Sequence, residues 1–317
     1  MKKYFLLLAI LMSCICVNAQ QIQFRIIGYL RLQNILDGQA SQVDYSKVTH
    51  LNIAFINPDS TGNFAAFKGL RAFVDRVHQY HVKVLASIGG GLAPAYYSAL
   101  LTDANRMAFM DKLAQLTELY NLDGVDIDLE GERIDTNYGN FITGLSLILK
   151  PKGKLLTAAV ATVYKTRYTD RALSLFDFIN IMSYDKTGPW KPENPGPHAP
   201  YYMAVEDLNY WVVEKGIPKN KLNLGIPFYG YGFGPNAPAD MSFRKIAGTY
   251  PGAANNDEID IPGGGTIYYN GILTIKNKTL LALQQAGGIM IWQLLQDAAG
   301  TNSLLNTVNA VISLKNK

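Results

Sequence analysis

The stretch LDGVDIDLEGE, residues 122–132, places five carboxylates among apolar residues in eleven positions. Residues two apart in a β-strand point to the same face, so Asp126, Asp128 and Glu130 share one face of the expected strand. The apolar residues between them, Val125, Ile127 and Leu129, share the other. Burying an unpaired carboxylate is very costly, so such a row must be paired or hold protons with raised pKa values. The stretch predicts a buried strand whose three carboxylates share protons.

Seven further apolar runs, rich in β-branched residues, recur along the chain. They are residues 24–30, 48–56, 82–90, 155–162, 176–184, 222–230 and 287–294. Stretches with helical spacing lie between them, among them 70–77, 107–116 and 273–285. Strand alternating with helix gives parallel pairing. Eight such units predict an α/β fold, a single-domain (β/α)8 TIM barrel, with a doubly wound sheet as the second choice. No Gly-x-Gly-x-x-Gly follows the first run, which weakens a nucleotide-binding version of that second choice.

Residues 1–19 have the form of a secretory leader. Two lysines precede a short apolar run, and small residues follow it, ending at Ala19. The alternative is a lipoprotein anchored at Cys14, although the residues before Cys14 make a poor lipobox. Both cysteines, Cys14 and Cys16, lie in this leader, so the mature chain is expected to have no disulfide and no thiolate chemistry. We expect a secreted or periplasmic protein with one domain over residues 20–317.

The charge and the histidines exclude several classes of protein. The formal charge is +4, or +2 without the leader, which is too small and dispersed for a nucleic-acid surface, so a largely neutral substrate is expected. No metal-ligand pattern joins the histidines, and no metal or cofactor is expected. The histidines are His50, His78, His81 and His198. No Gly-x-Ser-x-Gly turn supports a serine hydrolase. A monomer without an obligate protein partner is expected.

In a (β/α)8 barrel the active site lies at the carboxyl ends of the strands. Glu130, the last carboxylate of the row, is nearest that end, and two carboxylates behind it would help it to retain a proton as a general acid. One alternative is a calcium loop, but its last position would be Asn137 rather than a glutamate, and the apolar residues suit a strand better. Another alternative is a solvated acidic edge strand, which the apolar alternation argues against.

Residues 123–130 resemble the D-G-x-D-x-D-x-E signature of glycoside hydrolase family 18, the chitinases and endo-β-N-acetylglucosaminidases. Further segments resemble motifs of that family in the expected order, and the resemblance covers essentially the whole chain after the leader. These segments are SIGG (87–90), MSYD (182–185), GIPFYG (225–230) and GIMIW (288–292).

The resemblance implies substrate-assisted catalysis, an exception to the two-carboxylate scheme of retaining glycosidases. Glu130 would protonate the glycosidic oxygen while the 2-acetamido group of the sugar attacks its own anomeric carbon, and Glu130 would then act as a base. Asp128 would orient the acetamido N–H, with Asp126 behind it adjusting the position of the proton. Tyr184 would donate its hydroxyl to the acetamido oxygen. Without the motif, Tyr184 reads as a core tyrosine.

The family motifs also imply substrate-binding residues. Trp292 resembles the indole floor beneath the sugar ring, although on its own it reads as core, and Asp185 is expected to bind the sugar or the surroundings of Tyr184. Further residues are expected to line the cleft, each with plain packing as an alternative. They are Tyr29, Phe55, Met182, Trp190 and Tyr229. Asp123, near the start of the strand, reads as structural, and Ser87, Gly89 and Gly90 are expected to support close packing beside the carboxylates.

Some features depart from the commonest chitinase pattern. Leu129 replaces a frequent tryptophan, and Gly131 follows the catalytic glutamate. The connection over residues 231–272 is too short for a full chitinase insertion domain, so a shallow open groove is expected. The Pro-rich loop 186–201 is expected to contact the sugar beyond the cleaved residue. The substrate is chitin-like β-1,4-linked N-acetylglucosamine or, alternatively, the N-glycan core; a non-catalytic lectin is a third reading.

Overall fold

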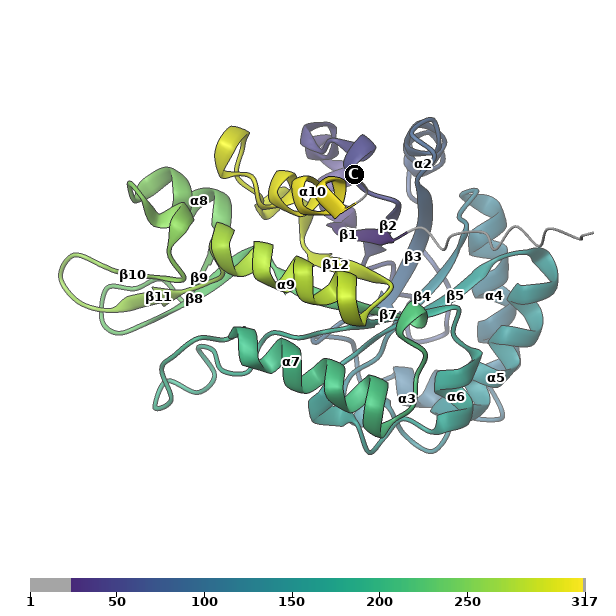
Figure 1. Ribbon diagram of the computed structural model, residues 1–317. Helices are drawn as coiled ribbons and strands as arrows, with labels where there is room; N and C mark the ends of the chain where they lie inside the picture. The colour runs from purple at the N-terminus through teal and green to yellow at the C-terminus, as the bar shows by residue number, and fades with distance from the viewer. Residues whose placement is uncertain (1–23, 316–317) are drawn as a thin grey trace, which may run out of the picture.

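The computed structural model describes residues 24–315, and the predicted leader with Cys14 and Cys16 lies outside them. Eight parallel strands close into a barrel in the order β1-β12-β7-β6-β5-β4-β3-β2 (Figure 1). The strands are β1 (Arg25–Arg31), β2 (His50–Ala54), β3 (Lys83–Gly89), β4 (Gly124–Asp128), β5 (Leu155–Val160), β6 (Phe178–Ile181), β7 (Leu222–Pro227) and β12 (Gly288–Trp292). Each strand lies within one of the eight predicted apolar runs or overlaps it. The predicted (β/α)8 barrel is confirmed.

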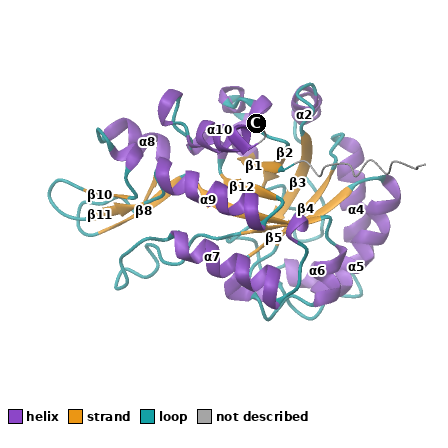
Figure 2. Ribbon diagram, viewed as in Figure 1, coloured by secondary structure: helices purple, strands orange, loops and turns teal. Residues whose placement is uncertain are grey.

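Most of the helices surround this barrel, and α8 lies to one side of it (Figure 2). They are α1 (Leu32–Leu36), α2 (Leu70–His78), α3 (Tyr97–Leu100), α4 (Arg106–Leu119), α5 (Tyr138–Leu149), α6 (Asp170–Leu175), α7 (Tyr201–Asn209, continued by a π-helical turn, Tyr210–Glu214), α8 (Phe243–Thr249), α9 (Ile272–Gln285) and α10 (Leu304–Lys315). The i, i+3, i+4 pattern correctly marks the buried face of α2, whereas Met107 at the start of α4 is 61% exposed. Across residues 24–315, no helix is long and apolar enough to cross a membrane.

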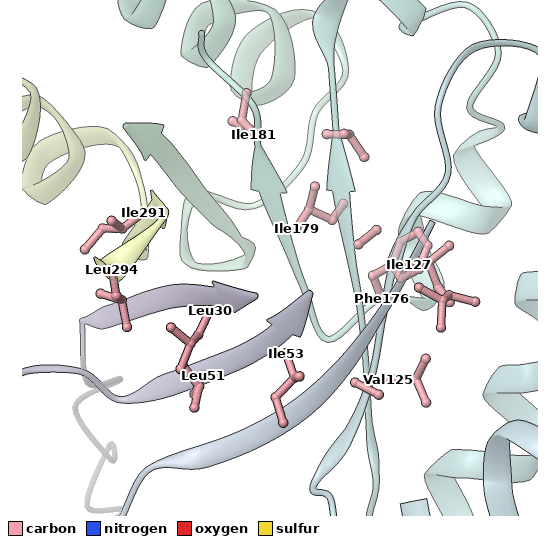
Figure 3. Close-up of a cluster of buried hydrophobic side chains, with 14 of the residues drawn as sticks. Leu30, Leu51, Ile53, Val125, Ile127, Phe176, Ile179, Ile181, Ile291 and Leu294 are labelled. Carbon is pink, nitrogen blue, oxygen red and sulfur yellow. The ribbon is translucent and has the colours of Figure 1, made fainter. Parts of the chain in front are cut away.

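Aliphatic side chains of the strands form the layer between barrel and helices. Figure 3 shows Val125 and Ile127 of β4 in this cluster together with Leu30, Ile53 and Ile179 from neighbouring strands. All five are completely buried, and each full burial of such a side chain contributes about 1.5–3 kcal/mol. The apolar face of β4 therefore points outward to the helices, which leaves its carboxylates on the inner face.

The seventh apolar run does not form a single strand. Strand β7 ends at Pro227, and after Phe228 the chain enters β8 (Tyr229–Phe233), which belongs to a different, four-stranded sheet. The sheet has the order β10-β11-β8-β9, with β9 (Asp240–Ser242), β10 (Glu258–Asp260) and β11 (Thr266–Tyr268). This sheet and α8 project to one side of the barrel (Figure 1). The connection is short, as expected, but its antiparallel sheet was not predicted.

Candidate active site

Asp126 lies inside the barrel and is completely buried. Its carboxylate accepts hydrogen bonds from the hydroxyl groups of Tyr29 on β1 (2.6 Å), Ser87 on β3 (2.8 Å) and Thr157 on β5 (2.6 Å). Burial raises the pKa of Asp126, while these hydroxyl donors oppose the rise. The prediction that all three carboxylates share protons is therefore wrong for Asp126. Hydroxyl groups from three other strands satisfy its carboxylate instead.

Asp128 ends β4 and is 3% exposed, and its Oδ1 accepts no hydrogen bond from any residue of the described chain. Burial raises the pKa of Asp128 well above its usual range, and the negative charges of Glu130 and Asp126 raise it further. The backbone N–H of Gly90 donates to the Asp128 carbonyl oxygen (2.7 Å). A Cβ on Gly89, whose φ is +107°, would lie 2.1 Å from that oxygen, so only glycine lets β3 approach so closely.

Glu130 stands two residues beyond β4, and its backbone is still extended, with φ −124° and ψ 154°. The alternation of faces therefore continues from Asp128 to Glu130, as the sequence predicts. Burial raises the pKa of Glu130 to about 7; the charge of Asp185 adds to the rise and that of Arg133 opposes it. A carboxyl group with a pKa near neutrality can donate a proton and later accept one at the same pH.

Tyr184 follows β6 and is 8% exposed. Its hydroxyl lies 3.7 Å from the sulfur of Met290, a weak acceptor. Gly225 on β7 leaves room for the ring, since a Cβ there would lie 3.0 Å from Tyr184 Cε1. The hydroxyl is therefore buried beside the carboxylates without being committed to a strong acceptor.

Asp185 and Tyr229 form a second polar group beside Tyr184. The Tyr229 hydroxyl donates to the Asp185 carboxylate, and the Tyr229 ring meets the Tyr184 ring edge-on at 6.3 Å between centroids. Tyr229 is 5% exposed, whereas the Asp185 side chain is 40% exposed. Of the two, Asp185 is accessible at the mouth of the barrel, and Tyr229 supports it from below.

Aromatic rings form one wall of the site. Trp292 stacks on Phe55, with centroids 5.6 Å apart, and Tyr29 packs against it at 5.5 Å. Trp292 and Phe55 line a cavity of about 530 Å³ together with residues at the ends of β1 and β3. Gly91 also lines this cavity, and a Cβ there would lie 3.5 Å from the Glu130 carboxylate. The Glu130 carboxylate thus lies beside a residue of the cavity that the two aromatic rings line.

The residues of this site follow one another along the chain in the same order as the motifs of a known family. Comparison with known proteins identifies that family. Residues 25–297 match the model of the glycosyl hydrolases family 18. The chain belongs to this family. The motifs of this family stand at the carboxyl ends of the parallel strands. The carboxylate row, the β3 glycines, the β6 tyrosine and the β12 tryptophan therefore meet at one end of the barrel.

Individual family 18 proteins resemble the chain over different lengths. The GH18 chitinase from the chitin utilization locus of Flavobacterium johnsoniae is 36% identical, with a TM-score of 0.84 over 91% of this chain and 94% of that one. A class V chitinase of Arabidopsis thaliana is 29% identical over 76% of this chain and 71% of its own length. A chitinase-like effector of Moniliophthora roreri is 30% identical over 62% of this chain, which spans only 56% of the effector.

The remaining predicted substrate-binding residues take different places in this family 18 barrel. Tyr29 is only 1% exposed, and its hydroxyl donates a hydrogen bond to Asp126. The prediction that it lines the cleft is therefore wrong. Met182 packs against the interior cluster that contains Tyr184. Trp190 is 54% exposed and meets Tyr231 edge-on at 5.2 Å, which leaves one face of its indole open.

Sequence reasoning missed two residues that hold the site. The amide of Asn57 donates to the Gly89 carbonyl (3.0 Å) and accepts from the Gly89 N–H (2.7 Å), which clamps the end of β3 beside Asp128. His198, which is completely buried, lies 3.4 Å from Asp185 and 3.3 Å from the Tyr229 carbonyl oxygen. Each is a lone polar residue in a loop, and no local pattern distinguishes it.

Residues 24–315 contain no cluster of three or more His, Cys, Asp or Glu side chains arranged to bind a metal ion. Asp126 and Asp128 lie in a strand, so the calcium-loop alternative does not fit. His78 has an acidic partner that the sequence did not reveal: its Nε2 lies 2.8 Å from Asp123 at the opposite end of the barrel. Asp123 is thus structural, as predicted.

A second hollow, of about 620 Å³, lies outside the barrel between the start of α5 and residues 167–171. Its polar lining includes Asp135, Asn140 and Arg167, without a buried carboxylate row. The family 18 site is therefore at the barrel mouth, where the titratable groups converge.

Proposed function

We propose that this family 18 protein is a retaining glycoside hydrolase that cleaves β-1,4-linked N-acetylglucosamine in chitin-like substrates. The observation that carries the proposal is the environment of Glu130, whose carboxyl group lies beside Gly91 at the edge of a cavity and has its pKa raised to about 7. The leader-like residues 1–19 support export as the setting, since a polymeric glycan lies outside the cell.

Glu130 performs the proton transfers of the proposed reaction. It donates its proton to the glycosidic oxygen as the bond to the anomeric carbon breaks, and the 2-acetamido oxygen of the same sugar attacks that carbon. The resulting oxazolinium ion is opened by water, from which Glu130 now takes a proton. This mechanism class comes with the family and not from the carboxylate spacing. A pKa near 7 suits both steps, because the group must be protonated in the first and ionised in the second.

Asp128 and Tyr184 hold the acetamido group for this attack. The buried Oδ1 of Asp128, which accepts no hydrogen bond within residues 24–315, is an acceptor for the acetamido N–H. The Tyr184 hydroxyl, which within residues 24–315 has only the weak contact to the Met290 sulfur, is a donor for the acetamido oxygen. Fixing the internal nucleophile in this way converts binding energy into orientation.

The cleft supports a neutral sugar as substrate. Trp292 and Phe55 offer apolar ring faces that suit the C–H faces of a pyranose. Asp185, which is partly exposed, can accept a hydrogen bond from the sugar, and the open indole face of Trp190 can contact a ring farther along the chain. Relatives of the protein are named chitinases, and one is named a chitinase-like effector, so catalysis needs a direct test.

The test incubates the mature protein and its Glu130→Gln variant with N-acetylglucosamine hexamers and, separately, with an N-glycosylated protein. Mass spectrometry is expected to find shortened N-acetylglucosamine oligomers from the wild type alone. Early proton NMR spectra are expected to show the β-anomer of the new reducing end, because the configuration is retained. Glycans released to leave one N-acetylglucosamine on asparagine would replace the chitinase proposal by an endo-β-N-acetylglucosaminidase. Binding of the hexamer without any product would indicate a lectin.

Glu132→Gln is the matched control for this experiment. Glu132 lies in the same loop, and its exposed carboxylate pairs with Arg167. The control is expected to cleave the hexamer at the wild-type rate. If both variants lost activity equally, the loop and not the Glu130 carboxyl group would be responsible.

A further inference from the structure

Helix α9 buries a lysine that the catalytic residues do not contact. Lys278 is completely buried, although an ammonium group is costly to remove from water unless other groups satisfy it. Its Nζ donates to the carbonyl oxygen of Ala199 (2.7 Å) and to Oδ1 of Asn270 (2.8 Å). Burial lowers the pKa of Lys278 to about 7, and the charges of Asp257 and Asp207 oppose this fall. This lysine therefore joins α9 to Ala199, which is 79 residues away in the sequence, and to Asn270, which lies just before the helix.

The Ala199 carbonyl receives a second hydrogen bond at the same place. Nδ2 of Asn270, a residue that is 3% exposed, donates to it at 3.0 Å. Asn270 follows β11 at the end of the insertion, whereas Ala199 ends the loop that leaves β6. Two buried donors thus converge on one backbone carbonyl, which fixes its position more firmly than a single bond would.

Ala199 leads directly to the active site. Its side chain belongs to the barrel-interior cluster with Tyr184 and Met290. The residue before it, His198, touches both Asp185 and the Tyr229 backbone, and the His198 carbonyl accepts from the Lys186 N–H (2.9 Å). Moving the Ala199 carbonyl would therefore move His198, which packs against the carboxylate that acts on Glu130.

We propose that Lys278, together with Asn270, is a positioning residue that fixes the end of loop 186–199 and so holds His198 against Asp185. Lys278 touches neither the cavity nor the carboxylate row, so its effect on catalysis is transmitted through the Ala199 carbonyl. The catalytic consequence rests on the proposed function, whereas the effect on the loop does not.

Hydrogen–deuterium exchange measured by mass spectrometry tests the loop directly. Lys278→Met removes both hydrogen bonds that Nζ donates and keeps most of the apolar stem. We expect peptides that cover residues 186–199 to exchange at least about tenfold faster, because the anchored carbonyl loses its lysine partner. Lys276→Met, at an exposed position of the same helix, is the matched control and should leave these peptides unchanged. Wild-type exchange over 186–199, with faster exchange confined to α9, would overturn the proposal.

Asn270→Asp covers the case in which Lys278→Met does not fold. It keeps the size of the side chain and the acceptor for Lys278 but removes the second donor to Ala199. Loop 186–199 is expected to exchange faster than in the wild type. An unchanged loop in Asn270→Asp would count against convergence of the two donors.

The pH profile of kcat/KM separates positioning from a general loss of stability. In Lys278→Met, Asp185 is held less well beside Glu130, so the alkaline limb should move to lower pH by about half a unit. Lys278→Gln, which retains one donor, should recover part of the shift, and Lys276→Met should show none. A lower rate with an unmoved limb would mean that Lys278 only stabilises the fold. If the wild type cleaves nothing, the proposed function fails, and the exchange experiment alone decides the positioning role.

Discussion

Asp123 and Glu130 lie at opposite ends of β4, and their pKa values shift in opposite directions. Burial raises the pKa of Asp123, but the N–H of Val84 and the side chains of Lys83 and His78 outweigh burial and lower it below its usual range. At Glu130, burial and the charge of Asp185 act together and raise the pKa to about 7. Two carboxylates of one segment therefore differ because one end of the barrel supplies hydrogen-bond donors, including a lysine, and the other supplies a like charge.

The comparison shows how to tell a structural carboxylate from a functional one. Asp123 has all its partners within the protein, which stabilise its charge. Glu130 has an environment that disfavours its charge, which costs folding free energy and makes the group chemically useful. Changes at the two ends should therefore have opposite effects on stability, and only one should affect catalysis.

The largest expected effect is on turnover. Replacing Glu130 by Gln should lower kcat on N-acetylglucosamine hexamers by about 10²–10⁴-fold, because the general acid is lost while the shape is kept. The affinity of the hexamer, measured by titration calorimetry, should change by less than about threefold. Asp123→Asn should leave kcat unchanged. If the kcat of Glu130→Gln were within tenfold of the wild-type value, Glu130 could no longer be distinguished from Asp123 as the functional carboxylate.

The second effect is on stability, with the opposite sign. Because the folded-state pKa of Glu130 is about 7 against an ordinary 4.5, the folded state binds more protons between these values and loses stability as pH rises through them. Glu130→Gln should therefore be more stable than the wild type by about 1–3 kcal/mol at pH 8, a gain that shrinks below pH 5. Urea denaturation at several pH values measures it. A difference independent of pH would contradict the raised pKa.

Asp123→Asn should lower stability by about 1–2 kcal/mol at pH 7, because the charged partner of Lys83 and His78 is lost. The folded-state pKa of Asp123 is lowered, so its contribution is present above the ordinary pKa and disappears as pH falls through the folded value. The wild type and the variant should begin to converge in thermal denaturation as pH falls below about 4. Asp103→Asn, at a side chain that is 85% exposed, is the control and should change stability by less than about 0.5 kcal/mol.

The smallest expected effect concerns the negative charge of Asp185, which lies at the mouth of the barrel near Glu130. Asp185→Asn removes the second-largest cause of the raised Glu130 pKa, so the alkaline limb of kcat/KM should move to lower pH by up to about one unit. Asp240→Asn, on the exposed start of β9, should leave the limb in place. An unmoved limb in Asp185→Asn would mean that burial alone tunes Glu130.

The sequence predicted the barrel and the inner face of β4 because both depend on local periodicity. Alternation placed Asp126 and Asp128 inside, and it continued to Glu130 even though the strand ends before it. The partners of Asp126 could not be predicted, because the three hydroxyl groups come from strands whose register around the barrel is set by closure and not by local pattern.

The insertion escaped prediction for a different reason. Strands β9, β10 and β11 have three residues each, too few for an alternation to be recognised. His198 and Lys278 also escaped, since a single histidine or lysine shows its partner only when distant segments are brought together. The sequence predicted the residues of the carboxylate row, but it did not predict the residues of distant loops that hold the site in place.

The direct passage from β7 into β8 limits how this protein can be re-engineered. Tyr229, which donates to Asp185, is the first residue of β8 and pairs with Ser242 of β9. A deletion of the whole insertion would therefore remove an active-site side chain along with the sheet. A chimera that exchanges insertions between relatives must place its first junction after Tyr229 and supply a strand to pair with it. The side sheet is not a detachable module, because its first residue is also a partner of Asp185.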